Sequence, residues 1–175
     1  NEVLNCLETR RSVRKYLPKQ IADAELNAIL EAGIYAPTAM GRQSPKIVVL
    51  QKPEDVAELE RMNAAVLGNP DSHPFYGAPT VLVVLADAKA GTAVEDGSLV
   101  LGNLMNAAHA LGVGSCWIHR AREEFASGEG KALLKRWGIE GDWIGVGHCI
   151  LGYAAEPAAP GTAPEGAAAH AAKAA

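Results

Sequence analysis

The segment DGSLVLGNLMNAAHAL, residues 96–111, is apolar around most of its circumference when it is built as an α-helix. Small residues stand among the large apolar ones, namely Gly102, Ala107, Ala108 and Ala110. A helix of this kind has no face suited to water, so it is buried either inside a domain or against another subunit. The chain must therefore form a core or a subunit interface that covers this helix.

Short β-branched segments and amphipathic segments alternate along much of the sequence. KIVVL, residues 46–50, is bounded by turn residues, and TVLVVLA, residues 80–86, has the composition of a central strand. Two further strands are expected in GVGSCWI and DWIGVGHCILGY, and helices are expected to begin near Asp23, Pro53 and Lys131, with Asp23 as an N-cap. The alternation predicts an α+β fold in which helices cover a sheet.

The chain has 175 residues, 49% of them hydrophobic, which is enough for one domain with its own core. After Tyr153 the composition changes to mostly Ala, Pro and Gly, so we expect a domain over residues 1–153 and a tail over residues 154–175. No apolar run approaches the roughly 20 residues of a membrane helix, and the N-terminal residues lack a secretory profile. These features predict a cytoplasmic protein that does not bind a membrane.

Arg10, Arg11, Arg14 and Lys15 lie close together in a chain whose net charge is −4. Helically spaced apolar residues stop just before them, so the cluster is expected at or after a helix end. The acidic overall charge argues against a nucleic-acid surface. The arginines and the Ser12 hydroxyl supply the positive charge and the donors that a phosphate monoester requires. A solvated basic helix end is the alternative interpretation.

Cysteine and histidine residues suggest two other kinds of site, and the sequence favours neither. Cys116 and His119 lie three positions apart, and His148 and Cys149 are neighbours on an expected strand, where adjacent side chains point to opposite faces. We therefore expect no metal site. No nucleophile motif surrounds Cys116. With Cys6 the cysteines number three and show no paired spacing, so we expect reduced thiols and no disulfide framework.

Four motifs occur in order along the chain: RRSVR at residues 10–14, APTAMGRQ at 36–43, FYGAP at 75–79 and LMNAAHALGVGSCWI at 104–118. Together they resemble the nitroreductase family of FMN-dependent oxidoreductases. The resemblance implies an α+β fold with a central, mainly antiparallel sheet flanked by helices. It also implies a homodimer in which the apolar helix is buried at the interface.

The resemblance further implies two FMN sites per dimer, each built from both chains by three groups of residues. The first group holds the phosphate and the pyrimidine side: Arg10 and Ser12 at the phosphate, Arg11 alongside, and Arg14 at the ribityl chain and pyrimidine edge. The second group approaches the ring from the partner chain: Pro37, Thr38, Ala39, Met40 and Gln43. The third group lines the other side, with the backbone of Ile118 and His119 near flavin N5: Cys116, Trp117, Ile118, His119 and Arg120.

In the nitroreductase family the flavin carries the chemistry, so the resemblance implies no catalytic side chain. It implies a ping-pong reaction in which FMN takes hydride from NADH or NADPH and then reduces a nitroaromatic, a quinone or a similar flat acceptor. Two other interpretations stay open on the sequence. The chain could be a specialised family member, such as a reductive dehalogenase or a flavin-fragmenting enzyme, or a flavin-binding regulatory protein without turnover.

Overall fold

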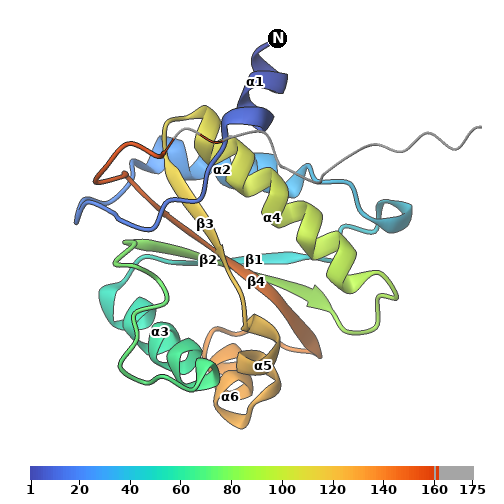
Figure 1. The fold of residues 1–175 in the computed structure, drawn as a ribbon. Coiled ribbons are helices and arrows are strands. Elements are labelled where there is room, and N and C mark those ends of the chain that lie inside the picture. Colours follow the sequence, from blue (N-terminus) through green and yellow to red (C-terminus); the bar gives the residue numbers. More distant parts are fainter. Residues whose placement is uncertain (160, 162–175) are drawn as a thin grey trace, which may run out of the picture.

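The computed structural model of the chain describes residues 1–159 and 161, so most of the tail expected at residues 154–175 lies outside the described residues. Figure 1 shows helices on both sides of a sheet, and the predicted α+β class is confirmed. The helices are α1 (Glu2–Thr9), α2 (Asp23–Ile34), α3 (Pro53–Leu67), α4 (Ala93–Ala110), α5 (Ala121–Ala126) and α6 (Gly128–Arg136). The strands are β1 (Lys46–Leu50), β2 (Thr80–Asp87), β3 (Gly114–Ile118) and β4 (Trp143–Gly152).

The four-stranded sheet has the order β1-β2-β4-β3, and all its neighbouring strands are antiparallel. The prediction that residues 80–86 form a central strand is confirmed, because β2 lies between β1 and β4. The ladder between β2 and β4 contains a bulge at Val146, since Val84 faces Gly147 whereas Leu85 faces Gly145. β1 and β3 form the two edges of the sheet.

Alternate side chains of β2 enter two separate cores. Val81, Val83 and Leu85 pack with residues of α3, α5 and α6, which lie below the sheet in Figure 1. Leu82 and Val84 pack with residues of α2 and α4 above it. Because both faces of β2 are covered, the strand can be apolar at consecutive positions, and its sequence does not alternate as a half-exposed strand would.

α4 begins at Ala93, earlier than the predicted start at Asp96. Its first turn carries acidic residues, which suit the positive end of the helix dipole. Val100, Leu101 and Leu104 are buried against the sheet, so the predicted burial is confirmed for this face, whereas Leu99 is half exposed. Among the helices that the structure describes, α4 included, none combines the length and hydropathy of a membrane span.

Two helix starts differ from the sequence prediction, and one helix had not been predicted. Asp23 does not cap α2, because Ala22 is the N-cap and the Glu25 side chain accepts its N–H at 2.9 Å. α6 begins before the expected start near Lys131, since the Ser127 hydroxyl caps it from the preceding loop. α5 was not predicted: its six residues are too few to show a helical period.

Candidate functional site

The basic segment after α1 lies against the outer edge of β3. Ser12 forms a bridge with Ser115 of β3, and the N–H of Val13 donates to the Ser115 carbonyl at 2.9 Å. Arg10 is the C-terminal cap of α1, which confirms that the arginines follow a helix end. The chain therefore places Arg10, Ser12 and Arg14 beside the first residues of β3.

Arg10 and Arg11 have different surroundings. Nη1 of Arg10 is buried and has no hydrogen-bond partner among the described residues. Burial raises the pKa of the Cys149 thiol, and the nearby Arg10 charge acts in the opposite direction. Arg11 instead donates to the carbonyls of Glu8 and Arg10, at 2.8 and 2.7 Å. A buried cationic N–H without an acceptor is costly, so the position of Arg10 suits an anion.

A hollow of about 230 Å³ adjoins this segment. Ser12, Arg14 and Lys15 line it from one side, and Glu156 lines it from the other. The start of the tail is tied to the segment, because Lys15 forms an ion pair with Glu156 and the Ala155 N–H donates to the Lys15 carbonyl at 2.9 Å. The first residues of the predicted tail thus contact the basic segment and help to enclose this hollow.

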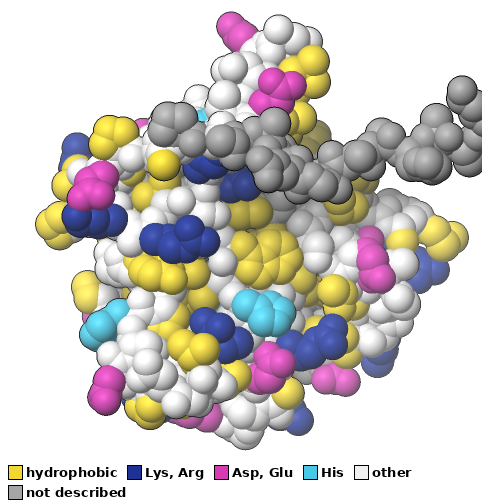
Figure 2. All heavy atoms as spheres, in the orientation of Figure 1, with side chains coloured by type: hydrophobic (Ala, Val, Ile, Leu, Met, Phe, Trp, Pro, Cys, Tyr) yellow, Lys and Arg dark blue, Asp and Glu magenta, His cyan; other side chains and the backbone are white. Residues whose placement is uncertain are grey.

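The far end of β3 borders a second hollow, of about 290 Å³. Its lining comes from β3, α4, α5 and β4 and includes Trp117, His119 and Arg122. Gly147 of β4 leaves room for the indole, since a Cβ there would lie 2.8 Å from Cε2 of Trp117. Figure 2 shows this side of the molecule, with Lys and Arg side chains above and below an apolar area that a histidine borders.

Side chains of β3 alternate between the two cores. Cys116 and Ile118 are buried on the side of α3 and α5, whereas Trp117 points toward α4. Only the main chain of Cys116 and Ile118 is therefore available to a ligand at the edge. His148 and Cys149 of β4 also point to opposite sides, which confirms the geometric argument against joint ligation. In the described part of the chain, no three His, Cys, Asp or Glu residues are grouped to hold a metal.

Residues 37–43 form a tight turn at the start of α4. A single 3₁₀ turn spans Ala39–Gly41, and Met40 adopts a φ of 56° with 86% of its surface exposed. The Gln43 N–H donates to the Thr38 hydroxyl at 2.9 Å, and the Gln43 side chain donates to the Ile34 carbonyl at 2.9 Å. Pro37 is exposed beside them. These contacts hold the turn and leave its tip open to a partner or ligand.

Some members of each predicted group of site residues line a hollow of the chain, and the three hollows are separate. Ser12 and Arg14 line the 230 Å³ hollow, and Trp117 and His119 line the 290 Å³ hollow. Gln43 lines a third hollow, of about 500 Å³, between α2, α4 and β1. A single chain therefore joins the first and third groups through β3 and leaves the second group apart.

Sequence reasoning missed two polar residues that hold the site residues in place. Asp96 is buried and accepts the N–H of Ala39 at 2.9 Å and the Thr92 hydroxyl at 2.9 Å. Asn63 of α3 is also buried and contacts His119 and Arg120. Asp96 could have been singled out in the sequence because it is an acidic residue in a nearly apolar helix. Asn63 lies in an amphipathic helix, where a polar residue is expected, so nothing in the sequence indicated its role.

Substitution tests whether Asp96 stabilises the 37–43 turn. Asp96→Ala removes the carboxylate that accepts from Ala39 and Thr92, so we expect the free energy of unfolding to fall by about 1.5–3 kcal/mol. Hydrogen exchange at the Ala39 amide should accelerate. Glu95→Ala removes the same charge from an exposed neighbour and should change stability by less than about 0.5 kcal/mol. Unchanged exchange at Ala39 in the Asp96 variant would contradict this role.

Comparisons with known proteins identify the family of the chain. The sequence matches the nitroreductase family over residues 7–153. A protein from Archaeoglobus fulgidus, provisionally named NADH dehydrogenase/NAD(P)H nitroreductase, is 32% identical over 87% of this chain and 85% of its own length. One of the same provisional name from Methanothermobacter thermautotrophicus is 30% identical, and the match covers 66% of this chain but only 60% of that relative.

A solved structure shares the whole fold. The crystal structure of a nitroreductase with bound FMN from Bacteroides fragilis matches with a TM-score of 0.88 and 31% identity, over 98% of this chain and 99% of that chain. The shared fold therefore includes the β3 edge and the segments that flank it. Since the family match also covers most of the expected domain, the chain belongs to the nitroreductase family.

Proposed function

We propose that the chain binds FMN along the outer edge of β3 and acts as an NAD(P)H-dependent oxidoreductase. The observation that carries the proposal is the buried Nη1 of Arg10, which has no acceptor among the described residues. A phosphate would supply that acceptor and balance the local positive charge. The FMN bound to the Bacteroides fragilis nitroreductase supports the choice of this anion.

The dimensions and chemistry of the β3 edge suit an elongated ligand with a phosphate at one end and a flat ring at the other. At about 3.3 Å per residue, the segment 115–119 spans about 13 Å. Arg10 and Ser12 would hold the phosphate end, and Arg14 would lie beside the ribityl chain and the pyrimidine edge. The main chain of Cys116 and Ile118, the Trp117 indole and the turn at His119 would border the ring.

When bound, FMN supplies the redox chemistry by taking hydride from NADH or NADPH and passing it to an acceptor. The residues of the chain bind and orient the participants, and we assign none of them as an acid or base. The 290 Å³ hollow beside Trp117 has room for a flat molecule. We propose nitroaromatics, quinones and similar flat compounds as the acceptors.

We also propose that the active form is a homodimer. Val3, Leu4 and Leu7 are more than half exposed on α1, which projects from the body of the chain in Figure 1. Leu99 and Leu111 expose further apolar surface along α4 and just after it. Apolar surfaces of this extent favour an interface between subunits. A second chain would also bring its 37–43 turn to a site that one chain leaves incomplete.

The dimer proposal predicts that the folded protein with bound flavin sediments as a dimer at micromolar concentration. Leu7→Glu places a charge on the exposed face of α1 and should weaken the dimer and the retention of FMN together, because both chains build the site. Glu8→Gln, on the same helix, should leave the dimer intact. A folded monomer of the unaltered chain that retains FMN fully would contradict the proposal.

Arg10→Ala tests the phosphate assignment. The variant loses a charged hydrogen bond worth about 1.5–3 kcal/mol, so the dissociation constant for FMN should rise about 10- to 150-fold. Fluorescence titration of the flavin-free protein with FMN measures this constant. Lys52→Ala removes the same charge from the exposed start of α3 and should leave the constant unchanged. An equal loss of affinity in the two variants would mean that the overall charge of the protein, and not a contact between Arg10 and the phosphate, determines the affinity for FMN.

Anaerobic titration of the flavin-loaded protein with NADH and, separately, NADPH tests the proposed activity. At least one donor should remove the visible absorbance of oxidised FMN, and a nitroaromatic or quinone added afterwards should restore it. Both half-reactions are expected because hydride enters and leaves through the same bound flavin. Tight FMN binding without reduction by either donor would instead indicate a flavin-binding protein without turnover.

A further inference from the structure

The turn that follows β3 contains a residue in an unfavourable backbone conformation. Arg120 has φ 80° and ψ 2°, in the left-handed region that glycine adopts far more readily. This turn leads directly from β3 into α5 and carries His119, whose side chain lines the 290 Å³ hollow. A non-glycine residue stays in this region only when its surroundings hold it there.

Asn63 holds both residues of the turn with one amide group. Its Nδ2 donates to the His119 carbonyl at 2.8 Å, and its Oδ1 accepts from Nε of Arg120 at 2.9 Å. The side chain comes from α3, far from the turn in sequence, and Asn63 has 0% of its surface exposed. The amide therefore binds the carbonyl of the His119–Arg120 peptide and the side chain of the strained residue.

Two further buried polar residues stand behind Asn63. Oε2 of Glu124 accepts from Nδ2 of Asn63 at 3.1 Å and lies 2.5 Å from Nε2 of His148. The Glu124 and His148 side chains are both 0% exposed, and the rings of Phe75 and Phe125 pack around the histidine. A polar pair in such apolar surroundings gives little net stability over apolar side chains of similar volume. Through Oε2 of Glu124 the pair contacts the Asn63 amide.

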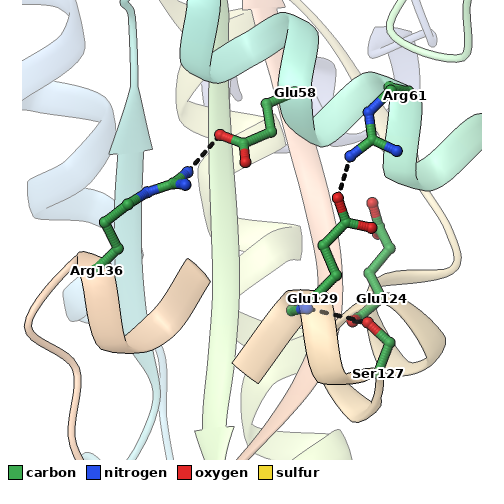
Figure 3. A network of polar contacts seen from close by, with 7 residues as sticks. Glu58, Arg61, Glu124, Ser127, Glu129 and Arg136 are labelled. Carbon is green, nitrogen blue, oxygen red and sulfur yellow. Dashed lines mark hydrogen bonds and ion pairs between the residues drawn. The ribbon is translucent and has the colours of Figure 1, made fainter. Parts of the chain in front are cut away.

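Ion pairs and a helix cap connect the helices that carry Asn63 and Glu124. Arg61 and Glu58 of α3 pair with Glu129 and Arg136 of α6, and the Ser127 hydroxyl caps α6 just after α5. Figure 3 shows Glu124 extending from α5 toward α3 beside these contacts. The three helices below the sheet also share one hydrophobic core, and from α3 Asn63 reaches the end of β3.

We infer that Asn63, Glu124 and His148 are positioning residues of the flavin site. Glu124 and His148 orient the Asn63 amide, and the amide holds the His119–Arg120 turn so that the end of β3 and the His119 side chain keep their places beside the ring. The inference rests on the proposed FMN site. It adds that residues on the opposite face of the sheet help to fix the positions of the groups around the ring.

Asn63→Leu tests the inference because it keeps the branched shape and the number of side-chain heavy atoms and removes both polar contacts to the turn. In the flavin-free protein, amide hydrogen exchange over residues 119–121 should accelerate. The dissociation constant for FMN should rise about three- to tenfold, as expected when displacement of the turn costs the flavin one neutral hydrogen bond. The visible circular dichroism of bound FMN should change as well, since the surroundings of the ring move.

Leu59→Ala is the matched control, because Leu59 lies on the same helix and is equally buried. It should destabilise α3 without changing exchange at 119–121, FMN affinity or the dichroism. Arg120→Ala provides a second route that leaves the core intact: it should reproduce the faster exchange, and in the double variant the two effects should not add. This second variant decides the question if Asn63→Leu does not fold.

The outcomes separate this inference from the proposed function. If neither substitution changes exchange over 119–121, or if Leu59→Ala produces the same changes, the positioning role is wrong. If exchange accelerates while FMN affinity and dichroism stay the same, the turn is held but does not serve the flavin, and the inference again fails. If the unaltered chain binds no FMN at all, the proposed function itself is overturned.

Discussion

β3 is fully paired along one edge and hardly paired along the other, and the rest of the site depends on this constraint. One edge of the strand is bonded to β4, and along the other edge the described residues provide only the Ser12 bridge to Ser115. Main-chain groups on an open edge attract a partner, and proteins seldom leave such an edge bare. Here the open edge lies between a buried arginine atom that has no acceptor among the described residues and a strained turn held by Asn63. An extended anionic ligand would satisfy the arginine and cover the edge.

The two faces of the sheet contribute differently to this edge. In the upper layer, α4 lines one side of the hollow beside Trp117 and holds the 37–43 turn through Asp96. The lower layer, with α3, α5 and α6, holds the His119–Arg120 turn through Asn63 of α3. β3 runs between them and receives side-chain packing from both. A small displacement of the helices in either layer would therefore shift β3 and the groups beside the proposed ligand.

Most of the fold was predictable because its signals are local. The β-branched segments at 46–50 and 80–86 and the nearly apolar helix gave the strands and the buried layer, since these patterns reflect burial on one or both faces. The short α5 was missed because six residues carry too little pattern. The left-handed Arg120 could not be foreseen either, since its conformation depends on Asn63, a residue distant in sequence.

The candidate site was only partly predictable from the residues. Local chemistry indicated an anion near the arginines, but the full set of site residues came from motifs shared with a family. The structure places two of the three groups along β3 and the third beside a separate hollow between α2, α4 and β1. Asp96, Asn63, Glu124 and His148 act through tertiary contacts that no short sequence window contains.

Hydrogen exchange of the main-chain amides with and without FMN tests the central claim most directly. If FMN lies along the open edge of β3, adding it should slow exchange at residues 116–119, and exchange at the opposite edge strand β1 should stay the same. β1 is a suitable internal reference because it is also an edge strand of this sheet. Slower exchange at β1 or at the surface of α1, with residues 116–119 unchanged, would contradict the account.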